Sequence, residues 1–322
     1  MMDGALLIWV LLVVLAATFV NGATDAPVLM SGSVLSGALS PRAAAVLSAL
    51  GNGAGLLVSL ALFPSVAETV TALARFGERG RVGLFALLAV LGASVAWAVA
   101  AWAFGIPTSE SHALVAGLAG ASVALGEGAN ILGASLEVLF GLALSLVGGY
   151  ALCCLLLRAA ECLSHRILCA KSGKFYRRAS AVLGGAMSFL HGAQDGQKFT
   201  CLFLLALSFG GVETGRAAWL LPALALSAGS ACVGGKILET LGGESALSPR
   251  GALASESAAA LCLAVLTAWG LPVSTTHLKT AALAAAKKDG HVLAPRLVLS
   301  WLLTFPACFC LAFFATRLFL RL

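Results

Sequence analysis

Long apolar runs recur along the whole chain of 322 residues, and most have about the length of a membrane-crossing helix. A helix needs roughly 20 apolar residues to cross a hydrocarbon core of about 30 Å. The chain is 60% hydrophobic and only 11% charged, whereas a soluble domain of this size keeps a substantial charged shell. Because the runs are continuously apolar and do not alternate, they disfavour a β-barrel. The sequence therefore predicts an all-α polytopic membrane protein with about ten to twelve membrane segments, and the apolar runs are residues 5–20, 28–39, 43–63, 82–104, 113–125, 131–157, 181–190, 199–209, 217–233, 252–269, 278–286 and 292–320.

Two short polar stretches interrupt these apolar runs, and each has a counterpart later in the chain. One pair reads NGATD and HGAQD, at residues 21–25 and 191–195. The other pair reads GIPTSESH and GLPVSTTH, at residues 105–112 and 270–277. The pentapeptide ALSPR, which suits a turn followed by a helix with proline in its first turn, also occurs twice. Matched landmarks in the same order predict an internal duplication.

The duplication divides the chain into a first transmembrane repeat, residues 1–157, and a second transmembrane repeat, residues 179–322. In many transporters such repeats have inverted topology, so that equivalent broken helices meet near mid-membrane, where substrate and ions bind. We expect inverted-topology repeats with broken helices and re-entrant hairpins here. An odd number of crossings in the first repeat gives this inversion, and an even number gives parallel repeats.

A basic segment, residues 158–178, separates the two repeats. It carries much of the formal net charge of +6, through Arg158, Arg166, Lys171, Lys174, Arg177 and Arg178. In a soluble protein such a segment could bind nucleic acid, but between membrane spans it is typical of a cytoplasmic loop that follows the positive-inside rule. We therefore predict a basic cytoplasmic loop, a multi-pass protein of the plasma (cell inner) membrane in contact with lipid, and no nucleic-acid partner.

Asp25 and Asp195 each end one of the polar interruptions. A carboxylate inside an apolar segment is energetically unfavourable, so it is usually paired, hydrated or functional. One interpretation makes both residues helix-terminus caps at the membrane surface. The other makes them ligands of a coupling cation, Na⁺ or H⁺, because hard cations prefer oxygen ligands. Their occurrence at both interruptions favours cation binding, with Asn21, Thr24 and Gln194 completing the shell.

The second pair of polar stretches places hydroxyl side chains after a proline. Pro107 and Pro272 suit the first turn of a new helix. The hydroxyls would then lie at a helix N-terminus, where unpaired N–H groups and the helix dipole attract an anion. An alternative is that they only cap the hairpin helices. Two such termini meeting at a pseudo-two-fold axis favour a site for a tetrahedral oxyanion, built from Ser109, Ser111, Ser274, Thr275 and Thr276.

Further polar residues lie in or near these stretches, and the sequence leaves two roles open for each. A histidine can be a hydrogen-bonded packing residue or part of a proton relay. A lysine can approach the anion or extend to the membrane surface, and a glutamate can couple to an ion or lie at the interface. These accessory candidates are Glu110, His112, His191, Lys198, Glu256 and His277, and Lys279 shares the alternatives of Lys198.

The two duplicated motifs resemble those of the inorganic phosphate transporter family, the PiT or PHO4-type permeases. That family carries a duplicated signature written approximately GAND and a GLPVSTTH-like hairpin in each half. The strongest matches here are HGAQDGQK at residues 191–198 and GLPVSTTH at residues 270–277, and the likeness spans nearly the entire chain. The resemblance implies that Asp25 and Asp195 join cation sites and that the hydroxyl residues of the hairpins contact phosphate.

The sequence departs from the family pattern at several positions, and one departure is Pro27-Val28, which replaces the polar continuation after Asp25. Thr24 and Gln194 stand where the signature usually has Asn, so the ligand distances around each aspartate should differ. Glu110 stands where the first hairpin commonly has Thr. A carboxylate beside a bound anion repels it unless the carboxylate is protonated or paired with a cation. Glu110 therefore favours proton coupling, or a metal-phosphate complex as the substrate.

The residues and the resemblance together predict a secondary active symporter that imports inorganic phosphate with Na⁺ or H⁺, and not an enzyme. No P-loop, HExxH or GxSxG motif occurs in the sequence. The alternatives are a sulfate or metal-phosphate permease of the same family, an anion channel and a phosphate sensor, and a homodimer is one open assembly. Nine cysteines fall mostly in apolar stretches without metal-ligand spacing, so no resident cofactor is expected.

Overall fold

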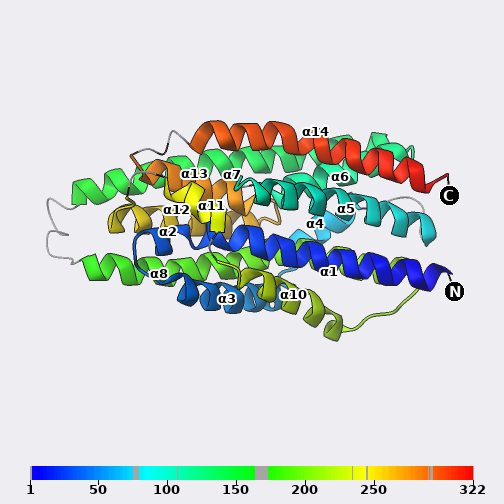
Figure 1. Ribbon diagram of the computed structural model, residues 1–322, viewed down its shortest axis with the longest axis horizontal. Coiled ribbons are helices and arrows are strands. Elements are labelled where there is room, and N and C mark those ends of the chain that lie inside the picture. The colour runs from blue at the N-terminus through cyan, green and yellow to red at the C-terminus, as the bar shows by residue number, and fades with distance from the viewer. Residues whose placement is uncertain are drawn as a thin grey trace.

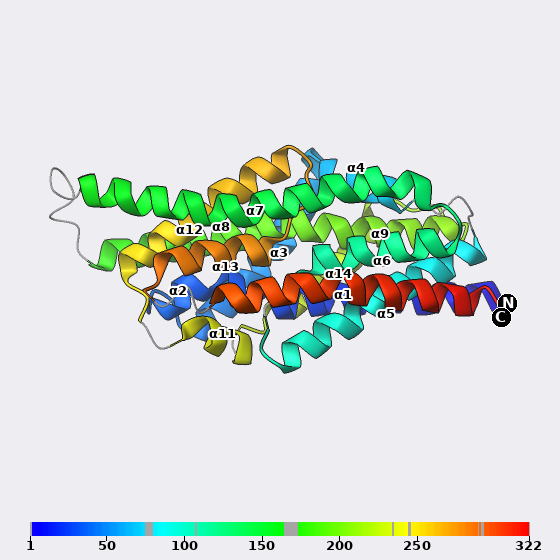
Figure 2. The ribbon, with the colours of Figure 1, turned by 90° about the horizontal axis from the view of Figure 1, so that it is seen from above.

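The computed structural model describes residues 2–74, 80–106, 108–163, 173–233, 235–243, 246–288, 290 and 293–321. Over these residues every regular element is helical, and the helices run largely along one long axis (Figures 1 and 2). The longer helices are α1 (Met2–Leu29), α3 (Pro41–Leu62), α5 (Arg81–Ala103), α7 (Gly128–Leu163), α8 (Gly173–His191), α12 (Pro249–Ala268) and α14 (Leu293–Phe319). The shorter elements are α2 (Ser31–Leu35), α4 (Ser65–Leu73), α6 (Glu110–Ala124), η2 (Gly192–Gly196), α9 (Gln197–Phe209), η3 (Arg216–Trp219), α10 (Leu220–Ser230), α11 (Gly235–Gly242) and α13 (Thr275–Ala286).

Six helices in the described residues are long and apolar enough to cross a membrane: α1, α3, α5, α7, α12 and α14. The helix formed by η3 and α10 is followed, after a bend of 55°, by α11, and together they make a seventh segment. Three further segments bring the total to ten: the interrupted helix α8–η2–α9 and the half-length helices α6 and α13. The prediction of an all-α polytopic membrane protein with broken helices and re-entrant hairpins is confirmed.

The two repeats have inverted topology. Helix α1 runs away from the end of the molecule that holds both termini, whereas α8 and α9 run back toward that end (Figures 1 and 2). The packing is exchanged between the repeats: α3 packs on α8 and α10 on α1, while α7 packs on α13 and α14 on α6. The two largest apolar clusters among the described residues lie around the α5–α6 hairpin and around the α12–α13 hairpin.

The two re-entrant hairpins have matching turns. Helix α5 ends at a Schellman-type cap in which Ile106 N–H donates to Ala101 O at 2.9 Å, and α12 ends in the same way with Leu271 N–H and Leu266 O at 3.1 Å. Each cap needs a left-handed residue, and Gly105 (φ 68°) and Gly270 (φ 69°) supply it. After these turns α6 and α13 begin near mid-length and run in opposite directions (Figure 2). Pro107 lies outside the described residues.

Glycines let the interrupted helices approach their neighbours backbone to backbone. A Cβ on Gly192 would lie 2.0 Å from the carbonyl oxygen of Asn52 in α3, and a Cβ on Gly22 would lie 2.5 Å from that of Leu226 in α10. Such contacts suit helix association in lipid, where close packing replaces the hydrophobic driving force. The glycine in each polar interruption therefore allows its helix to make close backbone contact with a helix of the opposite repeat.

The structure differs from the sequence prediction at the first interruption. Helix α1 continues without a break through Asn21 and Gly22 to Leu29, although it contains Pro27. Only the second interruption departs from α-helical geometry, as the π-helical segment η2. A proline removes one hydrogen bond, and its fixed φ is compatible with helix, so the surrounding packing can hold α1 together.

The predicted basic loop and the repeated ALSPR also look different in the structure. Residues 158–163 continue α7 and residues 173–178 begin α8, while residues 164–172 lie outside the described part of the chain. Both copies of ALSPR start a helix, with Ser40 and Ser248 as N-caps of α3 and α12. In the exchanged packing, however, α10 on α1 is the counterpart of α3 on α8, and the matching hairpin turns make α5 the counterpart of α12. The pentapeptides are therefore not equivalent under the pseudo-two-fold relation.

Candidate functional site

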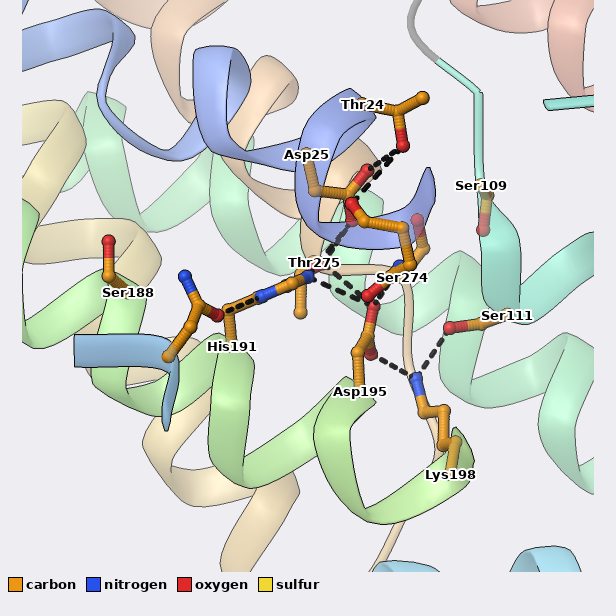
Figure 3. Close-up of polar contacts among 12 residues, drawn as sticks. Thr24, Asp25, Ser109, Ser111, Ser188, His191, Asp195, Lys198, Ser274 and Thr275 are labelled. Carbon is orange, nitrogen blue, oxygen red and sulfur yellow. Dashed lines mark hydrogen bonds and ion pairs between the residues drawn. The ribbon is translucent and has the colours of Figure 1, made fainter. Parts of the chain in front are cut away.

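Asp25 of α1 and Asp195 of η2 lie next to each other in the interior, with relative exposures of 1% and 2% (Figure 3). His191, at the end of α8, places Nε2 3.1 Å from Asp25 Oδ2 and 3.4 Å from Asp195 Oδ2. The three side chains each offer one ligand atom, and these atoms lie within 4.8 Å of one another. We call these three residues the central cluster. Its carboxylate oxygens are suited to a hard cation.

Each polar interruption also sends one side chain across to the carboxylate of the other interruption. Asn21 Nδ2 of α1 donates to Asp195 Oδ2 at 3.4 Å, and His191 contacts Asp25. Counted from the two aspartates, Asn21 and His191 occupy the same position, four residues earlier. The two polar interruptions therefore contact each other directly.

The ring of His191 is held on its other side by Asn52 of α3. Asn52 donates from Nδ2 to the carbonyl oxygen of Ser48 at 2.9 Å, so Asn52 Oδ1 faces His191 Nδ1. Asn52 on one side and the two carboxylates on the other therefore fix the orientation of the His191 ring. Sequence reasoning missed this role of Asn52. The available signal is a single amide in an otherwise apolar span.

Lys198 of α9 is buried beside the central cluster, with 1% exposure. Its Nζ donates to Asp195 Oδ1 at 2.5 Å, to Ser111 Oγ at 2.5 Å and to the carbonyl oxygen of Val273 at 2.7 Å (Figure 3). The side chain thus does not extend to the membrane surface. It connects the second interruption to both hairpins and places a positive charge between them.

The hydroxyl residues of both hairpins lie at the N-termini of α6 and α13. Ser109 Oγ accepts from His112 N–H at 3.2 Å and Ser274 Oγ accepts from His277 N–H at 3.1 Å, so both serines are N-caps. Both serine oxygens therefore cap their helices, as one of the two interpretations predicted. Each serine hydroxyl can still donate its proton to another group. Thr275 Oγ1 lies 3.3 Å from both Asp25 Oδ2 and Asp195 Oδ2. Ser111 and Thr276, in the same first turns, are buried.

Thr24 and Gln194, the residues before the two aspartates, make different contacts. Thr24 Oγ1 lies 3.4 Å from Asp25 Oδ1 and also donates to the carbonyl oxygen of Val20 at 3.0 Å. Gln194 donates to Leu271 O at 2.8 Å and accepts from Thr267 Oγ1 at 2.8 Å. The structure therefore brings Thr24 to its aspartate, whereas the longer Gln194 reaches the tip of the α12–α13 hairpin.

The other accessory candidates fall into three places, and Glu110 is the buried first residue of α6, directly after Ser109. Glu256 of α12 pairs with Lys279 of α13 at 2.5 Å, both side chains being fully buried, and Glu256 also accepts from the backbone N–H of Ser33 in α2 at 3.1 Å. This pair forms a separate polar contact between α12, α13 and α2. His112 and His277 meet edge to face with ring centroids 6.1 Å apart, one turn beyond the serine caps.

Inverted helical repeats that meet at buried carboxylates, with two helix N-termini directed at them, define a membrane transport protein. The sequence profile of the phosphate transporter family matches residues 21–171 and 166–312, and the chain belongs to that family.

Known proteins that resemble the chain agree with this assignment. A protein of Bacillus subtilis named a probable low-affinity inorganic phosphate transporter is 29% identical over 320 residues, covering 95% of each chain. A protein of Rhizobium meliloti with the same name is 30% identical, covering 94% of this chain and 93% of its own. A solved structure titled "The sodium-dependent phosphate transporter" shares the fold, with a TM-score of 0.85 at 17% identity, and the match covers 99% of this chain and 100% of that one.

Proposed function

We propose that this protein is a secondary active symporter that imports inorganic phosphate with Na⁺, with H⁺ as the alternative coupling ion. The observation that carries the proposal is the convergence of two helix N-termini, one from each repeat, on the buried pair Asp25 and Asp195. Thr275, in the first turn of α13, contacts both carboxylates. Groups suited to an anion and groups suited to a cation therefore share one site.

For the phosphate, we propose the first turns of α6 and α13 as the binding elements. Their free N–H groups and positive dipole ends favour a tetrahedral oxyanion, and Ser109, Ser111, Ser274, Thr275 and Thr276 add hydroxyl donors. Lys198 touches Ser111 and the backbone of the other hairpin, so its charge lies between the two termini. The family assignment supports phosphate as the substrate.

For the coupling ion, we propose the central cluster with Asn21 and Thr24. A cation held by Asp25 and Asp195 reduces their repulsion toward phosphate, so each ligand binds more tightly when the other is present, and this effect is reciprocal. Na⁺ is placed first because the structural relative is titled sodium-dependent. Carboxylates can carry protons as well, which keeps H⁺ as the alternative. No resident cofactor is part of the proposal.

For the orientation, we propose that the end at which α7 finishes and α8 begins faces the cytoplasm. Lys174, Arg177 and Arg178 lie at the start of α8, and Arg42 and Arg250 begin α3 and α12 at the same end (Figure 1). Lysine and arginine are enriched on the cytoplasmic side of membrane proteins. Both termini then lie outside, and the plasma membrane is the proposed location.

The test is uptake of radiolabelled phosphate by proteoliposomes, with Na⁺ and pH gradients imposed separately. Accumulation above equilibrium that follows the Na⁺ gradient supports the proposal, and accumulation that follows only the pH gradient assigns H⁺. Purely passive flux indicates a channel, and binding without uptake indicates a sensor. Sulfate competing as strongly as phosphate, or an absolute requirement for Mg²⁺, would replace phosphate by sulfate or by a metal-phosphate complex.

A further inference from the structure

Gln194 is fully buried, and its amide contacts the second hairpin. Its Nε2 donates to the carbonyl oxygen of Leu271 at 2.8 Å, and its Oε1 accepts from Thr267 Oγ1 at 2.8 Å. Leu271 lies in the turn between α12 and α13, three residues before the N-cap Ser274. The side chain of Gln194 therefore joins η2 to the turn that leads into the N-terminus of α13.

Side chains of two further elements hold the same turn. Thr69 Oγ1 of α4 lies 3.0 Å from the carbonyl oxygen of Gly270, and Lys198 Nζ of α9 donates to that of Val273 at 2.7 Å. Together with Gln194, they hydrogen-bond to three of the four carbonyl groups of residues 270–273. The second turn is thus fixed by elements outside its own hairpin.

The equivalent turn of the first hairpin, residues 105–108, is held differently. Lys236 of α11 donates to the carbonyl oxygen of Ala103 at 2.9 Å, before the turn. Trp97 Nε1 of α5 donates to the hydroxyl of Thr108 at 3.1 Å, within the same hairpin. Within the part of the chain that the structure describes, no side chain hydrogen-bonds to the carbonyl oxygen of residue 105, 106 or 108. The first turn therefore lacks the external hydrogen bonds of the second.

A cavity of about 450 Å³ lies beside the first turn. Thr24 of α1 and Trp102 of α5 both line it. Thr24 and Gln194 each directly precede an aspartate, and Trp102 and Thr267 each lie seven residues before the serine cap of their hairpin. The cavity therefore lies between the counterparts of the two residues that hydrogen-bond in the second repeat.

The short side chain of Thr24 explains the open space. Its hydroxyl bonds within α1, to the carbonyl oxygen of Val20 at 3.0 Å, and does not extend toward α5. A lipid acyl chain is one occupant that suits the cavity, since Phe19 and Trp102 line it and are exposed. An apolar chain, however, offers the turn no hydrogen-bond donor, so filling the cavity in this way does not fix the turn.

We propose that Gln194 is a positioning residue that fixes the α12–α13 turn and the N-terminus of α13, so that the α5–α6 hairpin is the one that moves during transport. The proposal rests on the proposed function, because it assumes that the site opens and closes around phosphate. Few external hydrogen bonds and adjacent empty space lower the free energy of a local movement. The contact from Ser111 Oγ to the carbonyl oxygen of Val273, 2.9 Å across the two hairpins, then separates when the site opens.

The first test is hydrogen–deuterium exchange of the purified protein, measured on peptides covering residues 105–112 and 270–277. The peptides are matched, since each has glycine first, proline third and serine fifth. In the wild type the first peptide should exchange about tenfold faster than the second. Gln194→Met keeps the length of the side chain and removes both hydrogen bonds, so it should speed exchange in the second peptide alone. Equal exchange of the two wild-type peptides overturns the proposal.

The second test is phosphate uptake by proteoliposomes. Gln194→Met should raise the KM for phosphate about tenfold and leave the Na⁺ concentration for half-maximal uptake nearly unchanged. The opposite result, a change in Na⁺ dependence with an unchanged phosphate KM, would make Gln194 a cation ligand and overturn the proposal.

Filling the cavity tests the first hairpin. Ala23 lines the cavity, so Ala23→Leu should slow maximal uptake several-fold without changing the phosphate KM, and Ala23→Ser, which adds little volume, is the matched control. Equal maximal uptake in both Ala23 variants contradicts movement of this hairpin. If exchange differs as expected but the wild type transports no phosphate, the proposed function fails and the role of Gln194 in fixing the turn stands. If coupled uptake is normal and Gln194→Met changes neither exchange nor KM, the positioning role fails alone.

Discussion

The two repeats have the same architecture but very different charges. Counted from Asp25 and Asp195, the buried Lys198 of the second repeat corresponds to Val28 of the first. Counted from the serine caps, the buried pair Glu256 and Lys279 corresponds to Leu91 and Leu114, and both leucines lie in the apolar core of the first hairpin.

This difference separates what the fold requires from what the site requires. The Schellman turns and the serine caps are the same in both repeats, so they belong to the architecture. Buried charges occur mainly in the second repeat, so the architecture does not need them. The first repeat contributes Asp25, and the second contributes Asp195 together with the buried Lys198. Changes that make the repeats more alike test this division.

The largest expected effects come from neutralising the two aspartates. Asp25→Asn and Asp195→Asn should each abolish ion-coupled phosphate uptake in proteoliposomes. They should differ in stability, because Asp195 pairs with the buried Lys198, and breaking a buried pair costs about 3–5 kcal/mol. The thermal midpoint should therefore fall much more for Asp195→Asn than for Asp25→Asn. Normal coupling in either variant would remove the cation assignment, and equal midpoints would remove the structural role of the Lys198 pair.

The second prediction concerns Glu256 and Lys279. Lys279→Leu leaves Glu256 buried without its cation and should lower the free energy of unfolding by about 3–5 kcal/mol. The double change of both residues to Leu copies the first repeat and should recover most of that loss, because well-packed apolar residues often replace a buried pair at little cost. Chemical or thermal unfolding in detergent measures both. A double variant as unstable as the single one would show that the repeats are not interchangeable at this point.

The third prediction compares the hydroxyl groups of the two hairpins. Ser109→Ala with Ser111→Ala, and Ser274→Ala with Thr275→Ala, should each raise the KM for phosphate about tenfold, since a lost hydrogen bond is worth about 1 kcal/mol and two together exceed 1.4 kcal/mol. Only the second pair removes a contact to both aspartates, so only it should also raise the Na⁺ concentration for half-maximal uptake, by a smaller factor. An unchanged phosphate KM in either pair would remove that hairpin from the site.

Much of the fold follows from local patterns in the sequence. Apolar runs predict the spans, and a glycine-proline turn followed by hydroxyl residues predicts each hairpin and its N-cap. These features depend on residues close in sequence, which is why the duplicated motifs could be recognised before any contact was known. The central carboxylates were predictable for the same reason, since each ends a polar interruption of an apolar run.

The features that sequence reasoning did not predict depend on contacts between distant segments. Asn52 looks like a packing residue until α3 places it against His191. Gln194 reads as the equivalent of Thr24, yet its longer side chain reaches Leu271 and Thr267. The continuity of α1 and the π-helical geometry of η2 likewise come from packing against different partners, because the two motifs are closely similar in sequence.

The smallest predicted effect concerns the two copies of ALSPR. Ser40 Oγ accepts from Ala43 N–H at 3.2 Å and Ser248 Oγ accepts from Gly251 N–H at 3.0 Å, so identical sequences form identical caps on helices that are not equivalent. Ser40→Ala and Ser248→Ala should each lower the free energy of unfolding by about 1 kcal/mol, with no change in phosphate KM. A large difference between the two losses would show that the surrounding repeat, and not the local sequence, sets the strength of a cap. Similar losses would mean that ALSPR is a local helix-start signal, which can recur without marking equivalent positions in the two repeats.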